Sequence, residues 1–219
     1  MTHDPDTHPT TSQQLAELEF SGRPLIVCDV DEVALHFIKH LDRHMRSNGY
    51  ELLARSYGLN GNIVGIEDQQ PADIDAVRYL LTSFFEDEVR NQTPVDGVTE
   101  VLNRLNSKAD VVFLTNVPAT HRQARTETLH GHGLAFPVIT NSGEKGPVVA
   151  KIAERAGNPI IFLDDSPIHM VSVRDHHPDT HLIHFVADKR FFDLTDPIDG
   201  VHMRTNDWHS VGAHLNDLL

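Results

Sequence analysis

The sequence predicts an α/β fold: a Rossmann-like parallel sheet with helices on both faces and a mainly helical cap inserted after the first strand. From residue 94 onward, short apolar runs alternate with stretches whose apolar residues recur at helical spacing. The chain has 219 residues, of which 39% are hydrophobic, enough for one globular domain that carries an insertion. Residues 36–93 interrupt the alternation with helical and turn-rich sequence.

The N-terminal part predicts a tail, a strand and a helix in that order. Residues 1–18 are polar and contain two prolines, so we expect a flexible tail. Residues 24–29 form the first strand. A helical face then ends at the Asn48-Gly49 turn signal, with apolar positions at Ala34, Phe37, Ile38, Leu41 and Met45.

The insertion continues with turn signals and a second helix. Residues 50–71 contain "YGLNGNIVG" and "EDQQP", which indicate loops or a short hairpin. The helix that follows ends before Pro94 and has on one face Ile74, Val77, Leu81 and Phe84 or Phe85. We therefore expect residues 36–93 to form the cap, with Phe84 and Phe85 in its core, and residues 19–35 and 94–219 to form the α/β core.

The second half of the chain shows regular alternation. Helices are expected at 98–105, before Gly131, and from Pro147 to residue 156, where Gly157 ends the helix. Strands are expected at 110–115, 135–140, 159–165 and 181–186.

Composition excludes several classes of protein. The formal net charge of -14 repels polyanions, which argues against a nucleic-acid polymer or an acidic membrane as the partner. No run approaches the roughly 20 apolar residues of a membrane span, and residues 1–20 lack the features of a signal peptide, so we expect a cytoplasmic protein. Cys28 is the only cysteine, which excludes an internal disulfide and a cysteine zinc cluster.

The 16 histidines raise the question of a metal site, especially in "DHHPDTHLIH" at 175–184. That segment has no compact ligand spacing such as H-E-x-x-H. On a strand, His181 and His184 would face opposite sides. We therefore interpret this segment as solvated surface.

Polar residues gather where the predicted strands end. In an open parallel sheet, ligands bind beyond the carboxyl ends of the strands. The residues at those ends are Asp29, Asp31, Thr115, Asn116, Lys145, Asp164 and Asp165. Two carboxylate pairs form a hard oxygen site suited to Mg²⁺, which accepts phosphate as a further ligand.

Most of these residues also have a structural interpretation, and Thr115 could be the N-cap of a helix. Asp29 and Asp31 could cap helices, and Asp164 and Asp165 could cap the helix that starts at Pro167. Lys145 competes with Lys151 as the charge-balancing lysine, and we favour Lys145 because Lys151 lies inside the predicted helix.

The ordered set of motifs resembles the haloacid dehalogenase-like superfamily of phosphatases. Four stretches match the four motifs of that family in order between residues 25 and 167: "IVCDVDEV", "VVFLTN", "EKGPVVAKIAE" and "IIFLDDSP". Position 32 departs from the pattern, because it is Glu where many members have Gly. The fourth motif has the adjacent Asp-Asp form.

The resemblance implies roles for these residues. Asp29 would be the nucleophile that forms an aspartyl-phosphate, and Asp31 the proton donor and base. Thr115 and the amide of Asn116 would orient the phosphoryl group, and Lys145 would balance charge. Asp164, supported by Asp165, would hold Mg²⁺ together with Asp29 and the carbonyl of Asp31, and the insertion at 36–93 would close over a small phosphorylated metabolite.

Alternatives stay open at this level. "DVDEVALHF" with "LDDSP" is similar to the deoxyribonucleotidase branch, which implies a nucleotide substrate. A non-catalytic binding protein with the same fold is also compatible with these residues. A phospho-accepting receiver domain would place its acidic pair and its phosphorylated Asp in another order, and a dehalogenase would not need Asp31.

Overall fold

The computed structural model describes residues 8–219, and its centre is a six-stranded sheet. All neighbouring strands pair in parallel, in the order β5-β4-β1-β6-β7-β8. The strands are β1 (Pro24–Cys28), β4 (Asp110–Thr115), β5 (Val138–Thr140), β6 (Gly157–Asp164), β7 (His181–Phe185) and β8 (Met203–Thr205). The predicted fold class is confirmed.

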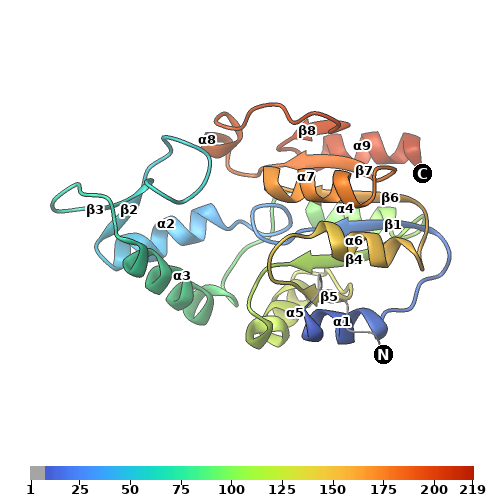
Figure 1. Ribbon diagram of the computed structural model, residues 1–219, viewed down its shortest axis with the longest axis horizontal. Coiled ribbons are helices and arrows are strands. Elements are labelled where there is room, and N and C mark those ends of the chain that lie inside the picture. Colours follow the sequence, from blue (N-terminus) through green and yellow to red (C-terminus); the bar gives the residue numbers. More distant parts are fainter. Residues whose placement is uncertain (1–7) are drawn as a thin grey trace.

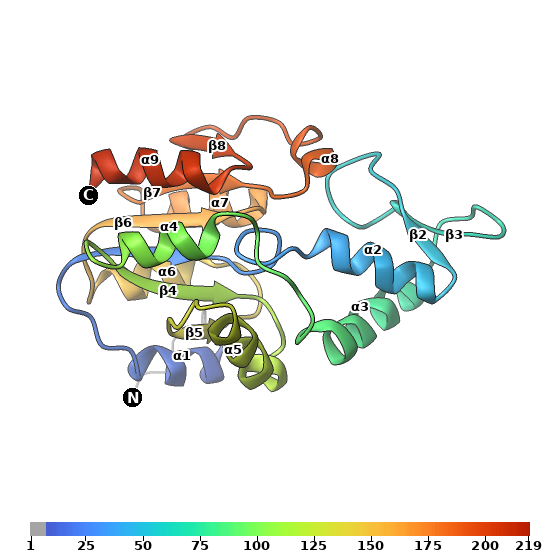
Figure 2. The same cartoon turned by 180° about the vertical axis from the view of Figure 1, so that it is seen from behind.

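Helices cover both faces of this sheet (Figures 1 and 2). On one face, Ile26 and Cys28 of β1 pack in an apolar cluster with α4 (Val98–Leu105), α5 (Arg122–Gly131) and α9 (Trp208–Leu218). On the other, Leu25 and Val27 pack with α1 (Pro9–Ala16), α6 (Gly146–Ala153) and α7 (Pro167–His176). Alternate residues of a strand point to opposite faces, and a strand buried on both faces is apolar throughout.

The insertion lies beyond the carboxyl ends of the strands (Figure 1). It contains α2 (Ile38–Ser47), β2 (Tyr50–Leu52), β3 (Ile63–Gly65) and α3 (Ile74–Glu88), and β2 pairs with β3 as an antiparallel hairpin. These elements share an apolar cluster with Val186 and with Phe191 of the short helix α8 (Lys189–Phe192). Phe84 is fully buried in this cluster, against the rings of Phe37 and Phe85.

The N-terminal segment differs from the flexible tail expected over residues 1–18. Helix α1 occupies Pro9–Ala16 and packs on β5, while residues 1–7 lie outside the described residues. Two of its polar residues, Thr11 and Gln14, are buried because they bind the sheet edge. Thr11 Oγ1 donates to the Thr140 carbonyl at 2.8 Å, and Gln14 Oε1 accepts from the Thr140 amide at 2.8 Å. The polar composition of residues 1–18 predicted a tail, because composition does not show that Thr11 and Gln14 bind the backbone of Thr140.

The order of the strands fixes where a ligand can bind. From β1 the chain continues to β4 and β5 on one side, and it returns to β6 on the other side of β1. The carboxyl ends of β1 and β6 therefore flank the point at which the winding direction reverses, where open α/β sheets bind ligands. Between residues 8 and 219, none of the helices combines the length and the apolar character needed to cross a bilayer.

Candidate active site

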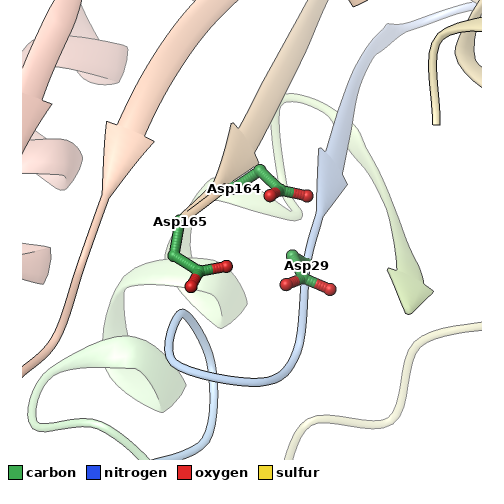
Figure 3. A group of neighbouring side chains, drawn as sticks. All are labelled: Asp29, Asp164 and Asp165. Carbon is green, nitrogen blue, oxygen red and sulfur yellow. The ribbon is translucent and has the colours of Figure 1, made fainter. Parts of the chain in front are cut away.

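Three carboxylates meet at the carboxyl ends of β1 and β6 (Figure 3). Asp29 directly follows β1, and its amide donates to the Leu163 carbonyl at 2.8 Å, which continues the pairing of the two strands by one residue. Asp164 is the last residue of β6, and Asp165 comes next. One carboxylate oxygen of each lies within 4.8 Å of the others.

Lys145 lies between two of these carboxylates. Its Nζ is 2.6 Å from Oδ1 of Asp29 and 2.7 Å from Oδ2 of Asp164, and its side chain is only 1% exposed. Burial disfavours the charged ammonium, but the carboxylates of Asp164 and Asp29 outweigh burial and raise the pKa of Lys145 above its usual range. The structure therefore brings Lys145 to the position that the sequence predicts, whereas Lys151 lies within α6.

The cluster carries more negative than positive charge. Burial raises the pKa of Asp29 to about 7, with repulsion from Asp164 and Asp31 adding to the effect and Lys145 opposing it. Burial and the neighbouring Asp164 and Asp29 also raise the pKa of Asp165 well above its usual range. One ammonium cannot balance three ionised carboxylates, so two of these groups tend to keep a proton without a further cation. A divalent cation bound by hard oxygen atoms fits this donor set.

Asp164 and Asp165 are held by further hydrogen bonds. Asp164 Oδ1 accepts from the amide of Ser166, the residue directly before α7, at 2.9 Å, and Oδ2 accepts from Nζ of Lys145. The hydroxyl of Tyr57 lies 2.9 Å from Oδ2 of Asp165 and 2.6 Å from its carbonyl oxygen. That carbonyl oxygen is also 2.8 Å from Nε2 of His184.

The carboxylate of Asp31 has different partners. Nη2 of Arg125 lies 2.8 and 3.0 Å from its two oxygen atoms, and Nε2 of Gln92 donates to Oδ1 at 2.9 Å. Asp31 is not one of the three clustered carboxylates. The sequence placed Asp29 and Asp31 together at a strand tip, but β1 ends at Cys28 and Asp31 lies in the loop that follows, so the two carboxylates do not share one set of partners. A metal-binding role of Asp31 through its carbonyl stays a prediction.

Thr115 and Asn116 lie at the end of β4, the strand next to β1. Thr115 is fully buried, and Asn116 is exposed. Nδ2 of Asn116 donates to the Gly143 carbonyl at 2.9 Å and lies 3.3 Å from Nε2 of His169. The phosphate-binding role of both residues stays a prediction.

Solved structures share this architecture over nearly the whole chain. A conserved haloacid dehalogenase-like protein of unknown function from Agrobacterium tumefaciens is 14% identical, with 89% of this chain and 98% of that chain covered and a TM-score of 0.62. The chain has the haloacid dehalogenase-like fold. No protein-family model matches the sequence, and no curated protein matches it.

Two other solved structures share the haloacid dehalogenase-like fold with this chain. A family hydrolase from Deinococcus radiodurans, solved with bound phosphate and sodium, is 13% identical, covers 90% of this chain and 96% of its own, and has a TM-score of 0.59. A predicted phosphoglycolate phosphatase from Haemophilus somnus is 13% identical, covers 92% and 100%, and has a TM-score of 0.58. Similarity at this level of identity concerns the fold.

Glu32 has a structural role that explains its departure from the pattern of the haloacid dehalogenase-like family. Its φ of 64° lies in the left-handed region, which is why Gly suits this position. The buried carboxylate accepts hydrogen bonds from the amides of Ile38 at 2.7 Å, Phe37 at 3.1 Å and Asp188 at 2.5 Å. Glu32 thereby joins the loop after β1 to the start of α2 and to the segment that leads into α8.

Sequence reasoning missed Arg125, Gln92 and Tyr57. Each contacts a predicted site residue from far along the chain: Arg125 is 94 residues from Asp31, Gln92 is 61 residues from Asp31, and Tyr57 is 108 residues from Asp165. None belongs to a motif of the haloacid dehalogenase-like fold quoted above. A single sequence carries no signal for such pairings, because nothing local distinguishes a buried arginine from a solvated one.

Proposed function

We propose that the protein is a Mg²⁺-dependent phosphomonoester hydrolase that acts on a small phosphorylated metabolite through an aspartyl-phosphate intermediate. The observation that carries this proposal is the buried Lys145 ammonium between Asp29 and Asp164. The ammonium offsets the negative charge of Asp29, the proposed nucleophile, at the carboxyl ends of β1 and β6. The four motifs in family order and the haloacid dehalogenase-like fold support the same function.

The carboxylates of Asp29, Asp164 and Asp165, with the carbonyl of Asp31, would hold Mg²⁺. All of these donors are hard oxygen atoms, as Mg²⁺ prefers. The bound cation would neutralise charge that develops on the phosphoryl oxygens.

The chemistry then divides between Asp29 and Asp31. A carboxylate oxygen of Asp29 attacks phosphorus and forms the aspartyl-phosphate, while the bond to the leaving oxygen breaks and that oxygen takes a proton from Asp31. Asp31 next removes a proton from water, which attacks the phosphorus, releases phosphate and restores Asp29. Thr115 and the amide of Asn116 orient the phosphoryl group, and Lys145 offsets its charge.

Residues 36–93 act in this proposal as the cap that closes over the substrate. Their elements lie beyond the carboxyl ends of the strands (Figure 1). The three clustered carboxylates lie at the same ends of β1 and β6 (Figure 3). Tyr57 of this segment already contacts Asp165. Closure of such a cap excludes water from the site and restricts the size of the leaving group.

A screen of phosphorylated metabolites, nucleotides included, with and without Mg²⁺ tests the proposal. We expect phosphate release that requires Mg²⁺, stops in EDTA and disappears in Asp29→Asn. Full turnover in EDTA would contradict the metal assignment. A folded protein that hydrolyses no phosphomonoester, aryl phosphates included, would instead indicate a non-catalytic binding protein.

A further inference from the structure

Two buried side chains hold the carboxylate of Asp31. Arg125 of α5 and Gln92 are both 0% exposed, whereas the side chain of Asp31 is 18% exposed. Nη2 of Arg125 contacts both carboxylate oxygens, and Nε2 of Gln92 donates to one of them. We call Arg125 and Gln92 the Asp31 clamp.

The two arms of the clamp come from different parts of the fold. Arg125 lies on a helix that packs on the sheet, so its backbone is fixed relative to β1. Gln92 lies in the C-terminal connector of the insertion, residues 89–93, which leads from α3 back to the core. Its Nε2 also donates, at 3.2 Å, to the carbonyl of His36 in the N-terminal connector, residues 36–37, which leads into α2. The connectors are joined again by the His36 amide, which donates to the Thr93 carbonyl at 2.9 Å. The position of Asp31 is therefore tied to both connectors of the insertion.

Stability alone does not account for this arrangement. Among the described residues, Nε and Nη1 of Arg125 and Oε1 of Gln92 have no hydrogen-bond partner. Leaving a buried polar group unpaired costs about 1–3 kcal/mol, and an apolar side chain of similar volume often replaces a buried ion pair without loss. The contact that distinguishes Arg125 is the one to Asp31.

We propose that Arg125 and Gln92 are positioning residues, which set where the Asp31 carboxylate gives and takes its proton. This inference rests on the proposed function, because it assigns the clamp to the proton-transfer step of that reaction. Arg125 fixes the position of the Asp31 carboxylate relative to Asp29. Gln92 couples the position of the same carboxylate to the connectors of the insertion.

The test compares an alkyl phosphate with an aryl phosphate in Arg125→Met. Proton donation matters for the poor alkyl leaving group and little for the acidic aryl one. Because a displacement of 1 Å can cost about 10²-fold in rate, we expect kcat for the alkyl substrate to fall by about 10²-fold and kcat for the aryl substrate to change far less. In the Asp31→Asn background, Arg125→Met should cause no further loss, since the group that it positions is already absent.

Control variants separate positioning from folding. Arg122 lies on the same helix as Arg125, but its side chain contacts the Val138 carbonyl and Glu17. Arg122→Met should therefore leave the ratio of the alkyl kcat to the aryl kcat unchanged. Gln92→Met removes the other residue of the clamp without a change of charge, and it should also lower the alkyl kcat more than the aryl kcat. This variant tests the clamp if Arg125→Met does not fold. Arg125→Lys should recover part of the alkyl rate.

The outcomes distinguish the clamp from the proposed function. A wild-type protein that hydrolyses neither substrate refutes the proposed function. A wild-type protein that hydrolyses both, with equal loss for the two substrates in folded Arg125→Met or Gln92→Met, refutes the clamp alone. Additive loss in the Asp31→Asn background also refutes it, because the arginine would then act independently of Asp31.

Discussion

The hydroxyl of Tyr57 lies 2.9 Å from Oδ2 of Asp165 and 2.6 Å from the carbonyl oxygen of the same residue, so these two acceptors share its single proton. Tyr57 belongs to the insertion, and Asp165 belongs to the carboxylate cluster at the end of β6. Burial and the neighbouring Asp165 carboxylate raise the pKa of Tyr57 well above its usual range, so the hydroxyl keeps its proton and stays a donor. The insertion thus supplies a hydrogen bond to a proposed metal ligand.

Replacing Tyr57 by Phe should weaken the binding of Mg²⁺. Loss of a partner that orients a metal ligand typically costs about 10- to 100-fold in metal affinity. Titration calorimetry with Mg²⁺ measures the change directly. Tyr79→Phe is the matched control, because Tyr79 is 66% exposed on α3. Equal affinity in wild type and Tyr57→Phe would contradict a role of this hydrogen bond in the metal site.

Replacing Lys145 by Met should destabilise the metal-free protein. The substitution leaves Asp29 and Asp164 without their shared cation, and removal of one partner of a buried ion pair costs about 3–5 kcal/mol. Urea unfolding in EDTA measures the free energy of unfolding, and added Mg²⁺ should recover part of the loss. Lys151→Met, six residues further along the chain in α6, is the control. The assignment fails if the two variants lose equal stability.

The two aspartates of the first motif should differ in their kinetic effects. Asp29→Asn should abolish turnover, since an amide is a poor nucleophile. Asp31→Asn should cost about 10²- to 10⁴-fold with an alkyl phosphate and much less with an aryl phosphate, whose leaving group needs little protonation. In the Asp31→Asn variant with the aryl substrate, phosphate should accumulate on Asp29. Peptide mass spectrometry after a quench locates it, and phosphate on any other residue would overturn the assignment.

The stabilisation by Mg²⁺ should depend on pH. The pKa of Asp29 is raised from 3.8 to about 7 on folding. Between these two values the folded state holds a proton that the unfolded state has lost, so the stability of the metal-free protein falls as the pH rises and then levels off. Mg²⁺ binds the deprotonated carboxylate, and its stabilising effect should therefore increase up to about pH 7.

Thermal unfolding with and without Mg²⁺, from about pH 5 to about pH 8, checks this dependence. Glu32, whose pKa is also raised to about 7 by burial, contributes in the same direction to the metal-free curve. Asp29→Asn should flatten the pH dependence of the Mg²⁺ effect. If Mg²⁺ raised the melting temperature by the same amount at every pH, the assignment of this pH dependence to Asp29 would be wrong.

Sequence patterns predicted the parts of the fold that depend on local apolar runs. The strand expected at 110–115 is β4 at Asp110–Thr115, because its interior is uniformly buried and so uniformly apolar. Strand β8 at Met203–Thr205 and helix α8 at Lys189–Phe192 were missed, since so few residues show no period.

The positions of the candidate site residues could be predicted from the sequence only where they lie at the ends of helices and strands. Asp29, Lys145 and Asp164 follow from their places at strand and helix ends, which sequence patterns locate. The partners of Asp31 do not follow, because the buried position of Arg125 and the turn of Gln92 towards Asp31 depend on tertiary packing. Sequence spacing locates the end of a helix or strand, but it does not show where the side chain of a residue in the following loop points.

Helix α1 also affects how the molecule meets its neighbours in solution. Strand β5 is an edge of the sheet, and the outward amide and carbonyl of Thr140 bind Gln14 and Thr11. An edge strand with unpaired backbone groups is a template for pairing with another chain, which leads to aggregation. By occupying those groups with side chains, α1 blocks the addition of a strand at Thr140 and so protects this edge from self-association.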